Sequence, residues 1–308
     1  MSALSVDPLW PRAGDWPSPA EGTDAVLLGV PAWRTSLSPT GAGETPAAVR
    51  AALRRFSPTL IGPPAIDLTA HLRIADAGDV DEPDGRDGEA RVRAAVAALA
   101  SSRLVIALGG DNSATYAVAQ GRGSQGLITL DAHFDLRDGE SNGSPVRRLI
   151  ADGLDPHRIV QIGIADFANS AAYARRAADA GITVITLDEV RRRGIDEVVS
   201  HALRVAGAAE ARPTAEDADA AAAAGGIHLD IDVDVCDRAV APGCPASVPG
   251  GLAAWELRAL VRGLARDPGV TSADIVEVDA TADTDDARTV RLAALCVLEL
   301  LAGMAERR

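Results

Sequence analysis

Residues 127–137 read Leu-Ile-Thr-Leu-Asp-Ala-His-Phe-Asp-Leu-Arg, an apolar run that turns at its end into alternating polar residues. The apolar run has the length of a strand, and Asp131, His133 and Asp135 follow it at every second position. In an extended segment, side chains at alternate positions project to the same side. We therefore expect a buried strand that ends in a cluster of two carboxylates and one imidazole.

Similar apolar runs recur along the chain and alternate with longer segments of helical period. This alternation is typical of a parallel sheet that helices cover on both faces. We expect strands at 25–30, 104–108, 127–130, 159–164, 183–186, 226–232 and 272–278. We expect helices at 46–56, 89–100, 146–152, 170–180, 187–206, 253–265 and 286–306. The predicted fold is α/β, three-layer α/β/α with a mostly parallel central sheet.

The domain organisation is predicted to be simple. No change of composition divides the chain, so we expect a single domain over residues 1–308. Residues 1–23 hold several prolines and no charged region that leads into an apolar core, which predicts an extended segment rather than a secretory signal. Residues 207–224 are rich in Ala, Asp and Glu and predict a surface excursion.

The charge balance excludes several classes of protein. The 308 residues include 30 basic and 44 acidic ones, a net charge of −14, so nucleic acid and membrane surfaces are poor partners. Every basic residue is arginine, so the amine of Schiff-base chemistry and of a Walker A loop is missing. The three cysteines form no C-x-x-C pair, which argues against a disulfide framework and for a cytoplasmic location.

Further acids lie at the ends of two other predicted strands. Asp111 and Asn112 follow the strand at 104–108, and Asp230, Asp232 and Asp234 end the strand at 226–232. The carboxyl ends of parallel strands meet at one edge of a sheet, where open α/β folds place their ligand sites. Buried carboxylates without lysines need a cation to offset their desolvation, and an oxygen-rich set with one imidazole favours manganese.

Local alternatives compete with this metal interpretation. An isolated D-x-H-x-D sequence is more often a solvated turn than a metal site, although two acidic strand ends in one chain reverse those odds. Asp111-Asn112 equally fits an N-cap for a helix that starts near Ser113. His71, His157, His201 and His228 have no comparable acidic pattern, so we expect them to be structural or exposed.

Several separated motifs resemble, in the same order, those of the ureohydrolase superfamily, which includes arginase, agmatinase and formimidoylglutamase. Residues 109–113 (GGDNS) resemble its G-G-D-H-S motif, 131–135 its D-A-H-x-D motif, and 228–243 its S-x-D-x-D motif with the following A-P-G. Residues 131–137, 141–147 and 277–293 look most like formimidoylglutamases. The S-G-N-x-H-G block expected of arginases is missing. The resemblance implies an arginase-like fold and an enzyme.

The resemblance also implies two manganese ions in each subunit. One would be held by Asn112, Asp131, Asp135 and Asp232, and the other by Asp131, His133, Asp232 and Asp234. Asn112 stands where the superfamily has histidine, and an amide oxygen is a weaker donor than imidazole. We therefore expect the first site to be the weaker one.

The implied reaction is the hydrolysis of a linear amidine C–N bond, most simply N-formimidoyl-L-glutamate to L-glutamate and formamide in histidine degradation. A hydroxide made between the two metals would attack the amidine carbon. Glu277 would bind the amidinium, and Asp234 would pass a proton to the leaving amine. The substrate carboxylates need donors, which we assign to Arg137, Asn142, Ser144 and Arg147; Arg147 equally fits a helix-surface charge.

Two other functions remain open. A ureohydrolase of the guanidino-acid or agmatine type would use the same site on a different small molecule. A non-catalytic regulatory homologue would keep the fold with an incomplete metal pair, but the retention of Asp131, His133, Asp135, Asp232 and Asp234 argues against such decay. We also expect a homo-oligomer that binds neither nucleic acid nor membranes.

Overall fold

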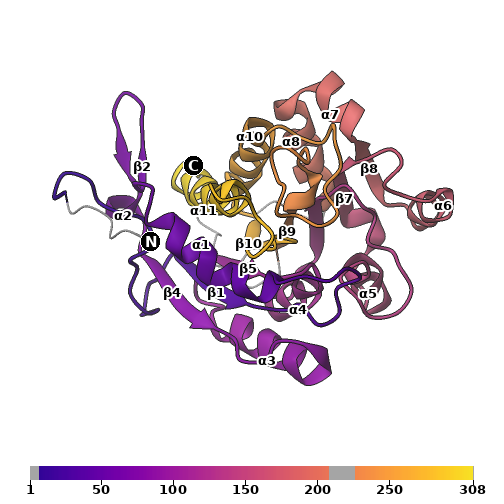
Figure 1. Ribbon diagram of the computed structural model, residues 1–308, viewed down its shortest axis with the longest axis horizontal. Helices are drawn as coiled ribbons and strands as arrows, with labels where there is room; N and C mark the ends of the chain where they lie inside the picture. The colour runs from indigo at the N-terminus through magenta and orange to yellow at the C-terminus, as the bar shows by residue number, and fades with distance from the viewer. Residues whose placement is uncertain (1–6, 208–225, 308) are drawn as a thin grey trace.

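A single eight-stranded sheet organises the computed structural model, which describes residues 7–207 and 226–307 (Figure 1). The strand order is β4-β1-β5-β10-β9-β6-β7-β8, and every pair of neighbours is parallel. The strands are β1 (Ala25–Val30), β4 (Ile74–Asp79), β5 (Leu104–Gly109), β6 (Gly126–Leu130), β7 (Ile159–Ile164), β8 (Thr183–Thr186), β9 (Ile227–Asp232) and β10 (Val270–Val276).

Helices cover both faces of this sheet (Figure 1). One face carries α1 (Thr45–Leu53), α7 (Leu187–Arg193), α8 (Ile195–Ala206), α10 (Ala254–Ala265) and α11 (Arg288–Ala305). The other carries α3 (Gly85–Ala98), α4 (Ser113–Arg122), α5 (Pro145–Ala151) and α6 (Ala171–Ala180). Within β1, Leu27 packs into the core of the first face and Leu28 into that of the second, as the alternation of a strand requires. The predicted three-layer fold is confirmed.

Short elements complete the described part of the chain. They are a two-stranded antiparallel sheet of β2 (Thr59–Leu60) and β3 (Ile66–Asp67), the helix α2 (Leu68–His71), and the 3-10 turns η1 (Ala42–Glu44), η2 (Pro156–Arg158) and η4 (Val233–Val235). Within the ranges that the structure describes, no helix is long and apolar enough to cross a membrane.

Besides the short elements β2, β3 and α2, which were not predicted, the structure differs from the sequence prediction in the central sheet and its helices. β4 was not expected, because it is an edge strand whose second half is partly or fully exposed and carries Asp76 and Asp79. α4 was considered only as the helix that Asn112 caps. The helix predicted over 187–206 is two helices, because Gly194 adopts φ 82° between α7 and α8.

Two predictions on domain organisation are left open. The surface excursion at 207–224 lies, except for Gly207, outside the described residues. Residues 7–24 form turns and irregular chain ahead of β1 and include no helix or strand. A single domain over 1–308 stays a prediction.

The middle of the sheet positions the predicted site. β5, β10, β9 and β6 are consecutive neighbours in the sheet, although they come from widely separated parts of the chain. Their carboxyl ends lead into Asp111, Glu277, Asp232 and Asp131, respectively. Because all four strands run in the same direction, these acids emerge at one edge.

Candidate metal centre and active site

Two groups of side chains at this edge share one residue, Asp131. The first group is Asp131, Asp135 and Asp232, and the second is Asp131, His133 and Asp234; in each, the potential ligand atoms lie within 4.8 Å of one another. The structure thus brings together five of the predicted ligands in an arrangement that two cations could occupy side by side.

Backbone hydrogen bonds hold these acids where the strands end. The Asp131 carboxylate accepts from the His133 backbone N–H at 2.6 Å, and the Asp232 carboxylate accepts from the Asp234 N–H at 2.9 Å. Each pair therefore closes a short turn that points the next acid back toward the site. Asp135 adopts a left-handed backbone with φ 52°, which is costly for a residue with a side chain and is often found at functional sites.

The electrostatics of the two groups favour a bound cation. Burial raises the pKa of Asp131 to about 6, and burial together with neighbouring acids raises the pKa values of Asp135 and Asp232 well above their ordinary range. For His133, burial lowers the pKa, but the charges of Asp234 and Asp131 outweigh it and raise the pKa to about 12. Without a metal, protons supply the missing positive charge.

The donor set fits manganese. Carboxylate oxygens with one imidazole nitrogen suit Mn²⁺ better than the softer metals that prefer thiolates. Asp131 is fully buried, and its Oδ2 has no hydrogen-bond partner within the described part of the chain. A buried carboxylate oxygen of this kind is costly unless something binds it.

Asn112, the sixth predicted ligand, turns its amide nitrogen toward these acids. Its Nδ2 donates to Asp135 Oδ2 at 2.7 Å and to Asp232 Oδ2 at 3.2 Å. Its Oδ1 accepts from the hydroxyl of Thr115 at 2.5 Å. The alternative role as a helix cap is met in part: Asn112 is the N-cap residue of α4 but its side chain makes no capping bond, whereas Asp111 Oδ1 accepts from the backbone N–H of Ser113 at 3.1 Å.

Glu277 lies beside the two groups and is held on one side only. Its Oε1 accepts from the Asn112 backbone N–H at 2.7 Å and from Asn142 Nδ2 at 2.8 Å. Burial raises its pKa to about 8, the charge of Asp111 adds to the rise, and the two hydrogen bonds oppose it. Its Oε2 has no partner among the described residues, so this oxygen is available to a ligand.

A cavity of about 390 Å³ opens onto both groups. Four acids line it, and Arg137 is the one arginine among the lining residues: the acids are Asp135, Asp232, Asp234 and Glu277. The guanidinium of Arg137 lies against Gly143 and makes no hydrogen bond or ion pair with other described residues. The cavity therefore combines several carboxylates with one cation that is left unpaired by the described part of the chain.

The other predicted substrate residues lie differently. Asn142 lines the cavity, but its amide is already bonded to Glu277 and to the backbone N–H of Leu37. Ser144 is fully buried against the Ser141 hydroxyl. Arg147 does not line the cavity: its guanidinium donates to the carbonyls of Arg137 and Gly139, so it braces the loop that carries Arg137.

Sequence inspection missed one residue in this site and left another without a role. Thr115 holds the Asn112 amide, and its position three residues along α4 is the signal that would have indicated the contact. Asp230 is fully buried below the site, directly opposite Asp274 of β10, and belongs to neither potential ligand group.

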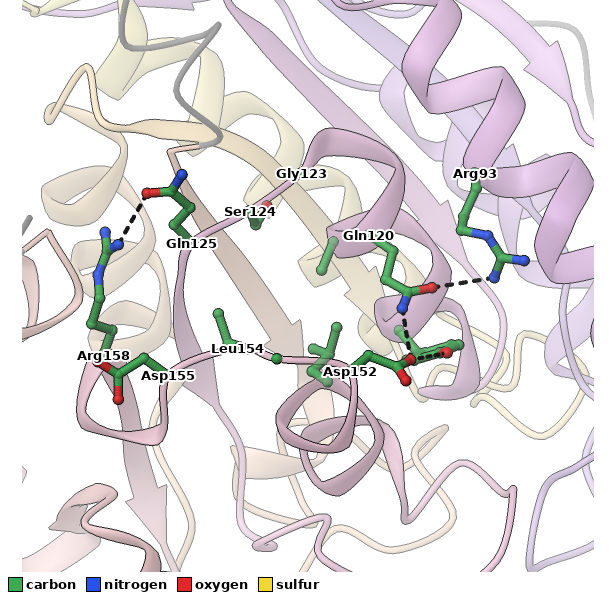
Figure 2. A pocket seen from close by; sticks show the side chains of 13 residues that line it. Arg93, Gln120, Gly123, Ser124, Gln125, Asp152, Leu154, Asp155 and Arg158 are labelled. Carbon is green, nitrogen blue, oxygen red and sulfur yellow. Dashed lines mark hydrogen bonds between the residues drawn. The ribbon is translucent and has the colours of Figure 1, made fainter.

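A larger cavity, of about 750 Å³, lies where α4 and α5 end and β6 and β7 begin, at the opposite edge of the sheet (Figure 2). Several of its polar side chains bond to one another, while the Ser124 hydroxyl has no partner among the described residues. Arg93 donates to Gln120 at 3.2 Å, Gln120 donates to Asp152 at 2.8 Å, and Arg158 donates to Gln125 at 3.2 Å (Figure 2). None of the predicted site residues lines it.

Comparisons with known proteins agree on one family. The model of the arginase family matches residues 23–303. Formimidoylglutamase of Bacillus subtilis (strain 168) is 34% identical over 296 residues, which cover 91% of this chain and 86% of that protein. Guanidinopropionase of Pseudomonas aeruginosa is 34% identical over 248 residues, which cover 76% and 72%. The crystal structure of the Bacillus subtilis formimidoylglutamase has a TM-score of 0.86 at 31% identity, covering 99% of this chain and 95% of that one.

Proposed function

Because this chain belongs to the arginase family, as its motifs predict, we propose that it is a manganese-dependent hydrolase of a linear amidine, most simply N-formimidoyl-L-glutamate. The products would be L-glutamate and formamide. The observation that carries the proposal is the polarity of the cavity, in which buried acids face the unpaired guanidinium of Arg137. That polarity matches a substrate with a cationic amidine at one end and carboxylates at the other.

The two groups that share Asp131 would hold the metal pair. Asp131, Asp135 and Asp232 would bind one ion, and Asp131, His133 and Asp234 the other. Asp232, which the family resemblance assigns to both ions, accepts a hydrogen bond from the Asp234 backbone N–H. When bound, the ions supply a water of lowered pKa, and thus a hydroxide, near neutral pH. Asn112 as oriented contributes hydrogen bonds rather than a ligand atom.

Three side chains would act on the substrate directly. Glu277 Oε2 accepts from the amidinium, and the cationic ligand favours the ionised form of Glu277. Asp234, whose Oδ2 lies 3.0 Å from His133 Nδ1, passes a proton to the nitrogen of the leaving amine. Arg137 binds a substrate carboxylate, and Arg147 and Asn142 hold Arg137 and Glu277 in position.

A guanidino acid is the second candidate substrate. The guanidinopropionase relative is as similar in sequence as the formimidoylglutamase one, over a shorter part of the chain. A guanidino acid also places a cation and a carboxylate at opposite ends, so the same cavity polarity would select it. Agmatine lacks the carboxylate and would leave Arg137 unpaired.

An assay of the manganese-loaded protein on a panel of substrates tests the proposal. N-formimidoyl-L-glutamate, 3-guanidinopropionate, L-arginine and agmatine would be compared for release of formamide or urea. We expect the highest kcat/KM for the first. A preference for agmatine would contradict the assignment of Arg137, and turnover of none would favour the regulatory homologue. A homo-oligomer and a cytoplasmic location stay predictions.

A further inference from the structure

The orientation of the Asn112 amide is set by the groups around it. The Asn112 NH₂ group donates to both Asp135 Oδ2 and Asp232 Oδ2, an orientation that ionised carboxylates favour because they only accept hydrogen bonds. On the other side, the Thr115 hydroxyl donates to Asn112 Oδ1. Every group in this chain of bonds is buried, and Thr115 is fully enclosed in the first turn of α4. Solvent therefore offers the amide no alternative partner.

This orientation opposes metal binding by the group that contains Asp135 and Asp232. An N–H cannot ligate a cation, and its partial positive charge faces the place where the cation would lie. For the amide oxygen to become a ligand, the amide must turn over, and Oδ1 then loses the bond that Thr115 donates. The NH₂ group that takes its place can only donate to the hydroxyl, so the buried hydroxyl proton of Thr115 loses its acceptor. Thr115 thus stabilises the non-ligating orientation.

We propose that Thr115 is a positioning residue that lowers the affinity of one metal site by holding the Asn112 amide with its nitrogen toward the acids. The inference rests on the proposed metal pair but not on the substrate. The ion held by Asp131, Asp135 and Asp232 would then exchange readily. The ion held by Asp131, His133 and Asp234 would be unaffected, because Asn112 does not face that group.

Replacement of the Thr115 hydroxyl tests the proposal. Thr115→Val keeps the shape of the side chain and removes the donor, so Asn112 is free to present its oxygen. We expect the weaker of the two Mn²⁺ dissociation constants, measured by titration calorimetry and by metal content after dialysis, to fall about tenfold. Thr115→Ser keeps the hydroxyl and should bind as the wild type does.

A double variant separates positioning from a general effect on packing. Asn112→His replaces the amide by an imidazole ligand and should also tighten the weaker site. Adding Thr115→Val to Asn112→His should change nothing further, because Thr115 acts through the amide. Thr115→Ala serves as a second probe if the valine variant melts early.

Three results would overturn the proposal: an unchanged or weaker dissociation constant in both the Val and Ala variants, a Ser variant that behaves like Val, or additive effects in the double variant. Failure to bind a second Mn²⁺ in any variant would overturn it as well. Substrate turnover is scored separately. Two bound ions without hydrolysis of any amidine would contradict the proposed function and leave the role of Thr115 intact.

Discussion

The two cavities at opposite edges of the sheet differ in how their polar groups are satisfied. In the cavity between α4 and α5, Asp152 accepts from both Tyr116 and Gln120. At the carboxyl edge, Asp131 Oδ2 is buried next to the cavity without a partner, and Glu277 is bonded through one oxygen only, as far as residues 7–207 and 226–307 show. In the larger cavity the charged groups named here are paired within the protein, although the Ser124 hydroxyl has no partner among the described residues; at the smaller one, carboxylate oxygens are left without a partner in the same part of the chain.

The proposed site is located by unsatisfied charge and not by cavity volume. Volume alone favours the opposite edge, at about 750 Å³ against about 390 Å³. A buried, unpaired carboxylate costs free energy in the folded state, so a ligand that relieves the cost binds well. Polar groups that are already hydrogen-bonded within the protein gain no comparable free energy from a ligand.

The largest expected effect follows from removing a carboxylate near both metal sites. Asp232→Ala should reduce kcat by at least about a thousandfold and lower bound manganese, because Asp232 joins one ligand group and also orients Asp234. Asp135→Ala should cost less, since Asp135 belongs to one group only. Steady-state kinetics and metal analysis measure both. Asp152→Ala in the other cavity is the control, and a comparable loss there would erase the contrast.

The next largest effect concerns the unpaired arginine. Arg137→Ala should lower kcat/KM for N-formimidoyl-L-glutamate about ten- to a hundredfold, mainly through KM, because a charge-assisted hydrogen bond contributes about 1.5–3 kcal/mol. Slow turnover of agmatine, which lacks a carboxylate, should be unaffected. Arg192→Ala, at an exposed position, is the matched control. Equal losses on both substrates would show that Arg137 does not bind a carboxylate.

The metal-free protein should lose stability as the pH rises. The folded pKa values of Asp131 (about 6) and Glu277 (about 8) lie above their ordinary values of 3.8 and 4.5, so the folded state binds more protons than the unfolded chain. The contribution of these two groups to stability is therefore greatest at low pH and decreases as the pH rises from about 4 to about 8. Melting curves with EDTA and with Mn²⁺ measure it. Manganese should reduce the dependence of Tm on pH, and Glu277→Gln should remove part of it. A Tm that rises between pH 4 and pH 8 without metal would contradict the raised pKa values of Asp131 and Glu277.

The smallest effect is expected in the other cavity. Tyr116→Phe removes one hydrogen bond to Asp152 and leaves the bond from Gln120, so the free energy of unfolding should fall by about 1 kcal/mol. Neither kcat nor bound manganese should change. Chemical denaturation measures the stability. A loss of activity in this variant would show that the two edges of the sheet are coupled.

The central sheet is predictable from sequence because buried parallel strands appear as continuous apolar runs. β5, β6 and β9 each end in acids that mark the carboxyl edge. This pattern does not predict β4, since an edge strand is partly exposed and need not be apolar along its length. The apolar pattern does not predict the break between α7 and α8 at Gly194 either, because the helical period continues on both sides of the glycine.

The side chains that ligate or bind are harder to assign from sequence. Arg137 and Arg147 lie ten residues apart in one motif, yet α5 begins between them and Arg147 turns back onto the loop backbone. The residue type at Asn112 is visible, but its orientation depends on Thr115 from the next turn and on acids from β6 and β9. Such contacts depend on the tertiary fold, which a local pattern does not contain.

The strand order also dictates when, during synthesis, the site can exist. β5 and β6 emerge from the ribosome early but are not neighbours, because β9 and β10, made much later, insert between them. The hydrogen bond between Asn112 and Glu277 can form only after a further 165 residues have been synthesised. A growing chain therefore carries Asp131 and Asp135 without the partners that complete a chelate. The proposed metal pair would therefore find its full ligand set only after β9 and β10 have been made.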